Sequence, residues 1–123
     1  MEAVQTAAFQ YNIALKGKYM IVELSGKLEE KGIREATEEI LKFSVETGIR
    51  RILYDATGVK QSDESRKSGI RYFKIISKKM ERLASYIPDR KIYSLAIFMS
   101  FLASAKNWKP FRSKDKAIAW LEA

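Results

Sequence analysis

The N-terminal part of the chain alternates between apolar and polar residues over two short segments. In residues 9–16 an apolar side chain falls at every second position, and the same holds for residues 19–25. A period of two is typical of strands that bury one face. Gly17 and Lys18 separate the segments and suit a two-residue turn. We therefore predict an N-terminal β-hairpin.

Two longer segments have apolar residues three or four positions apart, as in a helix that buries one face. The first covers residues 29–47 and ends at Gly48, a residue type favoured at helix C-termini. The second covers residues 65–87 and ends before a proline, because the residue that precedes proline avoids helical geometry. The predicted buried stripes include Val45 in the first helix and Ile76 in the second.

Two short, mostly apolar runs, residues 51–56 and 92–99, are predicted to be buried strands. Thr57 and Gly58 are expected to close the first run. Strands that alternate with helices pair in parallel through crossover connections. We therefore expect an α/β fold with a mixed sheet of four or five strands, in which residues 51–56 are central.

The C-terminal part of the chain contains shorter elements. Residues 101–108 are predicted to form a short helix, and Phe111 to begin a minor strand. Ser113 suits the N-cap of a last helix over residues 114–122, because its side-chain oxygen can accept a hydrogen bond from a free backbone N–H. The resulting order, β-β-α-β-α-β-α-(β)-α, fits a single domain at this chain length.

The composition excludes several kinds of active site. The 123 residues contain no cysteine and no histidine, so disulfides, thiol nucleophiles, Ser-His-Asp triads and ordinary zinc sites are excluded. Asp55 and Asp63 have no nucleophile or metal-binding shell near them. We therefore expect no catalytic, cofactor or metal site, and a protein that is not an enzyme. Without a membrane-spanning apolar run or a secretory signal, it is expected to be cytoplasmic.

Positive charge is the second compositional feature. The formal net charge is +8 at pH 7, which favours anionic partners. A basic face of the second predicted helix contains Arg71, Lys74, Lys78 and Arg82. It is interpreted either as a solvated surface or as a contact for an acidic protein, a second copy in a homodimer, or an anionic lipid. Nucleic acid is disfavoured, because no recognised reading motif accompanies the charge.

Large aromatic residues are the third feature. Core packing is the simplest interpretation of the two tryptophans, Trp108 and Trp120. The alternative is an apolar groove for a small apolar ligand or a lipid. The residues that would line this groove are Phe98, Phe101, Trp108 and Phe111.

Residues 53–65 read LYDATGVKQSDES, and residues 111–121 read FRSKDKAIAWL. These segments resemble the STAS family, the fold of the anti-sigma-factor antagonists, and in particular its SpoIIAA-like branch. Asp55 and Gly58 match the end of the family's central strand, and Asp63 matches its second aspartate. The resemblance implies one STAS-like domain over residues 1–123, with helices mainly on one face of the sheet. It also implies a non-enzymatic regulatory or protein-interaction function.

The sequence departs from this family at the phosphorylation site. In the antagonists, the residue after the second aspartate is a serine that a partner kinase phosphorylates, and here that residue is Glu64. Carboxylate is an imperfect, permanently charged substitute for phosphoserine. The resemblance implies a partner-binding surface, for which the alternative is a helix N-cap. The residues of this surface are Asp55, Gly58, Ser62, Asp63, Glu64 and Ser65.

Overall fold

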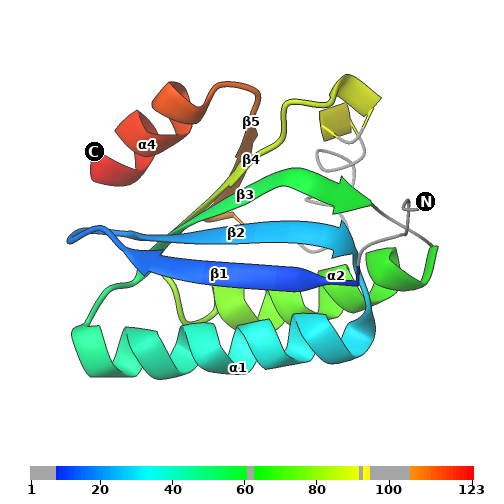
Figure 1. Cartoon of the computed structure of the whole chain (residues 1–123). Coiled ribbons are helices and arrows are strands. Elements are labelled where there is room, and N and C mark those ends of the chain that lie inside the picture. Colours follow the sequence, from blue (N-terminus) through cyan, green and yellow to red (C-terminus); the bar gives the residue numbers. More distant parts are fainter. Residues whose placement is uncertain (1–7, 61–62, 92, 95–105) are drawn as a thin grey trace.

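The computed structural model describes residues 8–60, 63–91, 93–94 and 106–123. Its strands are β1 (Gln10–Leu15), β2 (Met20–Lys27), β3 (Arg51–Lys60), β4 (Arg82–Tyr86) and β5 (Trp108–Phe111). Its helices are α1 (Glu30–Thr47), α2 (Asp63–Ser77) and α4 (Lys114–Glu122). They build the mixed α/β domain that the hydrophobic pattern predicts (Figure 1).

The five strands form one sheet in the order β1-β2-β3-β4-β5 (Figure 1). β1 and β2 pair antiparallel, which confirms the predicted hairpin, and Gly17 in its turn has a φ of 84°. The remaining pairs are parallel. β3 is therefore the central strand, as expected for residues 51–56.

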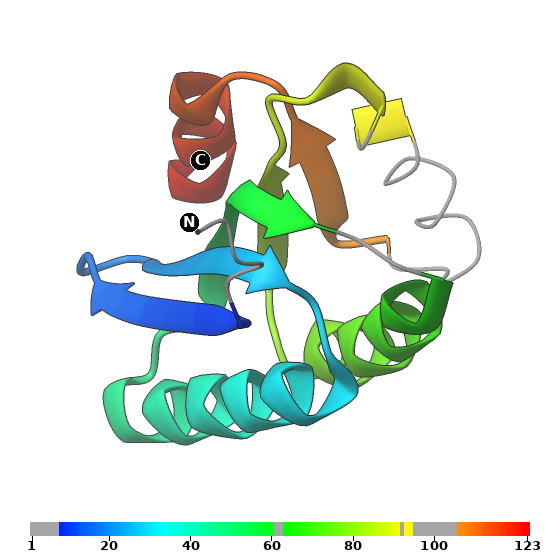
Figure 2. The same ribbon diagram turned by 45° about the vertical axis from the view of Figure 1, so that its right-hand side comes forward.

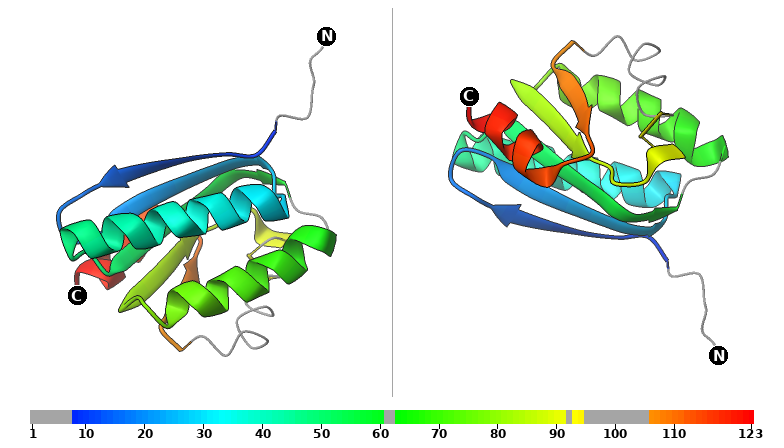
Figure 3. Two further views of the ribbon diagram at one scale, coloured as in Figure 1. Left: turned by 90° about the horizontal axis from the view of Figure 1, so that it is seen from below. Right: turned by 90° about the horizontal axis from the view of Figure 1, so that it is seen from above.

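Helices cover both faces of the sheet, with the two long helices on the same side (Figures 2 and 3). α1 and α2 lie next to each other below the sheet in Figure 2, and α4 lies above it. The core beneath α1 and α2 includes Ile52 and Tyr54, whereas Leu53 packs with Leu121 beneath α4. β3 is consequently buried on both faces, which explains its nearly continuous apolar sequence.

α1 ends as predicted but buries a different face from the one expected. Gly48 adopts the left-handed conformation with a φ of 78°, and its N–H donates to the Ser44 carbonyl. Ile40 is buried, whereas Val45 is 86% exposed, so its predicted burial is wrong. Val45 follows Ile40 by five positions, which rotates it about 140° around the helix at 3.6 residues per turn.

The second long helix is shorter than predicted. α2 ends at Ser77, and β4 occupies residues 82–86 of the segment that the apolar spacing assigned to the same helix. Leu83 and Ala84 are both fully buried, in the cores on opposite faces of the sheet. A strand covered on both faces needs apolar residues at consecutive positions. Such residues also fit a helical spacing, so the pattern misled the prediction.

The predicted elements between β4 and α4 also need correction. Tyr93 and Ser94 are helical, although residues 92–99 were expected to form a strand. Residues 95–105, which include most of that strand and most of the predicted helix over 101–108, lie outside the described residues. Trp108 begins β5, where it pairs with Leu83 of β4, and Phe111 ends that strand instead of beginning one.

α4 is fixed at both ends. The Ser113 side chain accepts a hydrogen bond from the Lys116 N–H at 3.3 Å, which confirms the predicted N-cap. At the other end, Arg51 of β3 donates to the Leu121 carbonyl and Arg82 of β4 donates to the Trp120 carbonyl. Cationic side chains stabilise the free carbonyls of a helix C-terminus. The neighbouring strands β3 and β4 therefore hold the end of this helix.

Candidate functional site

The residues that resemble the family motif lie where β3 ends and α2 begins. The prediction that β3 closes at Thr57 and Gly58 is wrong, because the strand continues to Lys60. The register between β2 and β3 shifts after Asp55, because Glu23 opposes Asp55 while Ser25 opposes Gly58. β3 thus has one extra residue at this point. Bulges of this kind redirect side chains and are common beside functional sites.

Asp55 is the ionised residue with the most contacts at this strand end. One carboxylate oxygen, Oδ1, accepts hydrogen bonds from the Thr57 N–H at 3.1 Å and from the Thr57 hydroxyl at 2.6 Å. The other oxygen, Oδ2, lies 3.4 Å from Lys114 Nζ. The Asp55 side chain is 13% exposed. These contacts join the middle of β3 to the first residue of α4.

The contacts keep Asp55 ionised. Burial raises the pKa of the Asp55 carboxyl and is the largest single influence. The hydrogen bonds from Thr57 and the positive charge of Lys114 lower it, and together they outweigh burial, so the pKa lies below its ordinary value. Asp55 therefore presents a fixed negative charge with no proton to donate at neutral pH.

Gly58 is required by the close approach of β2. A Cβ atom at position 58 would lie 3.0 Å from the Ser25 Cβ and 3.4 Å from its Cα. A side chain here would push the two strands apart at the bulge. The family-like glycine thus has a packing role in this chain, and its backbone is exposed.

α2 begins at Asp63, two residues before the predicted start. Its first turn accordingly contains Asp63, Glu64 and Ser65, which follow the end of β3 along the chain. For these three residues the described part of the structure gives only the backbone. Ser62 lies outside the described residues. Acidic residues in the first turn of a helix interact favourably with its dipole.

Lys114 belongs to this site, although the sequence analysis did not select it. Parallel strands bring their carboxyl ends to one edge of the sheet. Because β5 is parallel to β4, the chain that follows β5 emerges at the same edge as Asp55. The sequence could have revealed the pairing of Lys114 with Asp55 only if residues 108–111 had been recognised as a strand.

The predicted basic face does not form a single surface. Arg71 and Lys74 are exposed on α2, and Lys78 is exposed in the turn that follows. Arg71 also lies 3.8 Å from Glu30 of α1, in an exposed pair that contributes little to stability. Arg82 instead lies in β4, where its guanidinium stacks over the Trp120 ring at 5.2 Å. The basic face therefore consists of Arg71, Lys74 and Lys78.

The predicted aromatic groove is also wrong, because Trp108 and Phe111 lie on opposite faces of the sheet. Trp108 packs in the core beneath α1 and α2, whereas Phe111 packs with Trp120 on the opposite face, at 5.8 Å between ring centroids. Adjacent positions along a strand alternate between faces, so residues 108 and 111 cannot line one groove. Phe98 and Phe101 lie outside the described residues.

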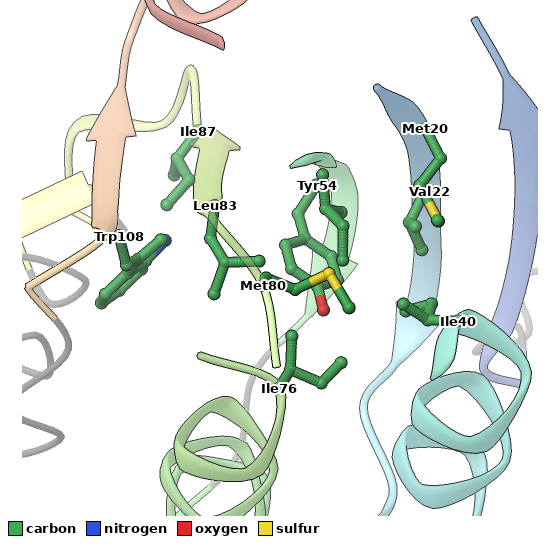
Figure 4. Packing of buried hydrophobic residues seen from close by; sticks show 10 residues of the cluster. Met20, Val22, Ile40, Tyr54, Ile76, Met80, Leu83, Ile87 and Trp108 are labelled. Atoms are coloured by element: carbon green, nitrogen blue, oxygen red, sulfur yellow. The ribbon is translucent and has the colours of Figure 1, made fainter. Parts of the chain in front are cut away.

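An apolar cavity of about 120 Å³ lies elsewhere, between the sheet and the two long helices. α1 contributes Ala36 and Ile40 to its wall, α2 contributes Phe73 and Ile76, and Tyr54 of β3 lies opposite them. Figure 4 shows the Tyr54 ring extending from β3 toward Ile76 and Met80. The sequence pattern marked these positions only as core.

Metal sites and membrane-spanning helices are both absent from the described residues. No group of three or more carboxylate, histidine or cysteine side chains within them could hold a metal ion. In the same part of the chain, no helix is both long enough and apolar enough to cross a membrane. The described surface is thus characterised by the strand end around Asp55, the exposed bases of α2 and the apolar cavity.

Comparison with known proteins identifies the family. The SpoIIAA-like family matches residues 19–122, and the chain belongs to this family. A solved, uncharacterized protein with a SpoIIAA-like fold from Shewanella loihica PV-4 is similar, with a TM-score of 0.68 and 18% identity over 98% of this chain and 99% of that chain. None of the curated proteins matches the sequence.

Two anti-sigma factor antagonists of known structure share the fold. SpoIIAA in its unphosphorylated form has a TM-score of 0.66 and 15% identity, over 94% of this chain and 99% of that chain. The antagonist from Mycobacterium paratuberculosis has a TM-score of 0.65 and 9% identity, over 94% of this chain and 96% of that chain. At such identities the likeness concerns the fold. It confirms the STAS-like architecture that the sequence motifs indicated.

Proposed function

We propose that this protein is a non-enzymatic regulatory domain that binds a protein partner through the surface where β3 ends and α2 begins. The observation that carries the proposal is the arrangement around Asp55, a fixed carboxylate held by Thr57 and Lys114, in the strand that leads along the chain into the first turn of α2. Two solved proteins with this fold are anti-sigma factor antagonists, which supports a regulatory role.

Glu64 makes this binding constitutive. It stands at the position where the resemblance places a phosphorylated serine, and a carboxylate there carries one permanent negative charge. A phosphoserine would carry about 1.5–2 negative charges, and only while phosphorylated. The protein consequently presents one charge state to its partner and has no phosphorylation switch at this position.

We expect the wild-type protein to gain no phosphate when it is incubated with a switch kinase of its host and ATP. Intact mass spectrometry measures the result directly. The Glu64→Ser variant restores the hydroxyl that the kinase modifies in the antagonists, so it is expected to gain one phosphate. Stoichiometric phosphorylation of the wild type at Ser62 or Ser65 would contradict the proposal.

The docking surface is tested by comparing two baits in affinity capture from a lysate of the native host. Glu64→Arg reverses the charge in the first turn of α2, whereas Glu38→Arg makes the same change at an exposed position in the middle of α1. A partner that binds at the β3–α2 surface is expected to be retained by the wild type and by Glu38→Arg but lost from Glu64→Arg. Equal capture by all three baits would place the interaction elsewhere.

A second function on the same fold is the binding of a small apolar ligand. The apolar cavity between the sheet and α1 and α2 favours it. The cavity reaches the region between β3 and α2 through Val59 and Gly69, but it lies on the other face of the sheet from the contact between Asp55 and α4. The two functions are tested by different measurements, the capture of a protein partner and the binding of a small probe.

A further inference from the structure

Tyr54, at the wall of the apolar cavity, carries a buried hydroxyl that has no partner among the described residues. Tyr54 is 8% exposed, and its hydroxyl makes no hydrogen bond within the part of the chain that the structure describes. Buried polar groups in native proteins are nearly always paired, and leaving one unpaired destabilises the fold. An unpaired hydroxyl at a cavity wall therefore points to an acceptor that is not among the described residues, such as a bound molecule.

Two other hydroxyls at the cavity wall are already engaged. Thr37 donates to the Ile33 carbonyl at 2.8 Å, within its own helix. Ser85 accepts a hydrogen bond from Trp108 Nε1 at 2.7 Å. Of the hydroxyls on the described residues that line the cavity, those of Tyr54 and Tyr72 take part in no hydrogen bond. Tyr72 is partly exposed, so water can reach its side chain, whereas Tyr54 is buried. The buried polar demand of the cavity is thus concentrated at the Tyr54 hydroxyl.

The charge of the site restricts the ligand further. No lysine, arginine, aspartate or glutamate is among the described residues that line the cavity. A charged ligand would lose its hydration there without gaining an opposite charge. Burial also raises the pKa of Tyr54, so its hydroxyl keeps its proton. As a hydrogen-bond donor, it needs an acceptor on the ligand.

The volume sets the size of the ligand. A dry apolar cavity of about 150 Å³ in an engineered protein binds benzene or xenon. The present cavity, at about 120 Å³, is slightly smaller and is walled by aromatic and branched aliphatic side chains. The cavity is partly open to the surface, and its enclosed part matches one six-membered ring with a small substituent.

We propose that the cavity between α1, α2 and the sheet binds a compact neutral molecule, of the size of a single six-membered ring, whose carbonyl or ether oxygen accepts a hydrogen bond from Tyr54. This inference rests on the second function proposed above, to which it adds the class of the ligand. Apolar contacts with residues such as Ile40 and Phe73 supply the affinity, and the single hydrogen bond supplies the selection among ligands.

Two probes separate these contributions. Xenon tests whether the cavity accepts an apolar guest, and cyclohexanone adds a ring and a carbonyl acceptor. Binding is followed on the isolated full-length protein by the NMR shifts of the methyl groups of Ile40 and Ile76. Both probes are expected to shift these signals, and the charged analogue cyclohexanecarboxylate is expected to bind more weakly than cyclohexanone.

Tyr54→Phe removes the hydroxyl and preserves the ring. It is expected to weaken cyclohexanone binding about threefold to tenfold, the contribution of one neutral hydrogen bond, and to leave xenon binding unchanged. Ala36→Leu fills the cavity and should abolish binding of both probes, whereas Ala119→Leu, at an exposed position of α4, should preserve it.

The outcomes distinguish the two levels of the proposal. If xenon binds but Tyr54→Phe leaves the affinity for cyclohexanone unchanged, the hydrogen-bonding ligand class is overturned while apolar binding stands. If neither probe shifts the methyl signals of the wild type, both are overturned. Neither result bears on the partner surface, because no partner takes part in the measurement.

Discussion

The Ile76→Ala substitution is expected to lower the free energy of unfolding by about 2–5 kcal/mol. Ile76 is 1% exposed and lies on the face of α2 that packs against the sheet, within the core that contains Met80 and Leu83 (Figure 4). The substitution removes apolar contacts and enlarges the cavity beside Tyr54, and both effects destabilise the folded state. Urea unfolding followed by circular dichroism measures the change.

The adjacent residue provides the matched control. Ile75 lies on the same helix but is 41% exposed, so Ile75→Ala removes the same atoms from a position that is only partly buried. We expect this substitution to cost less than about 1 kcal/mol, because surface changes away from special features have small effects. Equal losses from the two variants would show that α2 does not pack on the sheet by the face described.

The second large effect is a loss of stability at alkaline pH that depends on Tyr54. Burial raises the pKa of Tyr54 in the folded protein above the ordinary value of about 10. Between these two pKa values the unfolded chain releases the proton and the folded protein keeps it. The stabilisation is therefore complete below about pH 10 and is lost as the pH rises above it, by about 1.4 kcal/mol per pH unit.

The comparison with Tyr54→Phe isolates this contribution, because all other ionisable groups are common to both proteins. At pH 8 we expect the variant to be more stable than the wild type by about 1 kcal/mol, since it lacks the unpaired buried hydroxyl. Above pH 10 its advantage should grow with each pH unit. Urea unfolding at a series of pH values provides the data, and parallel curves for the two proteins would mean that Tyr54 is not buried in the folded state.

The sequence predicted the elements whose signals are local. Alternation identified the hairpin, Gly48 marked the end of α1, and Ser113 marked the start of α4. The error over residues 82–86 arose because a strand covered on both faces has no polar side, so its pattern is not distinct from that of a helix. That distinction depends on what packs above and below the strand.

The candidate site could be predicted only in part, for a related reason. The family motif located Asp55 and the first turn of α2, which are close in sequence. Lys114 is separated from Asp55 by 59 positions, and only the parallel alignment of β3, β4 and β5 brings them together. The lack of a hydrogen-bond partner for the Tyr54 hydroxyl was also not predictable from the sequence. It depends on which side chains the helices place around Tyr54.

The attachment of α4 has a consequence for the synthesis of the protein. One face of the sheet, including Leu53 and Ala84, is covered by α4, whose last carbonyls bind Arg51 and Arg82. α4 leaves the ribosome after every strand that it covers. While the ribosomal tunnel still holds this helix, the nascent sheet exposes an apolar face and two arginines without their carbonyl partners. The domain therefore completes its fold only after this segment emerges, and until then the exposed face is a target for chaperones.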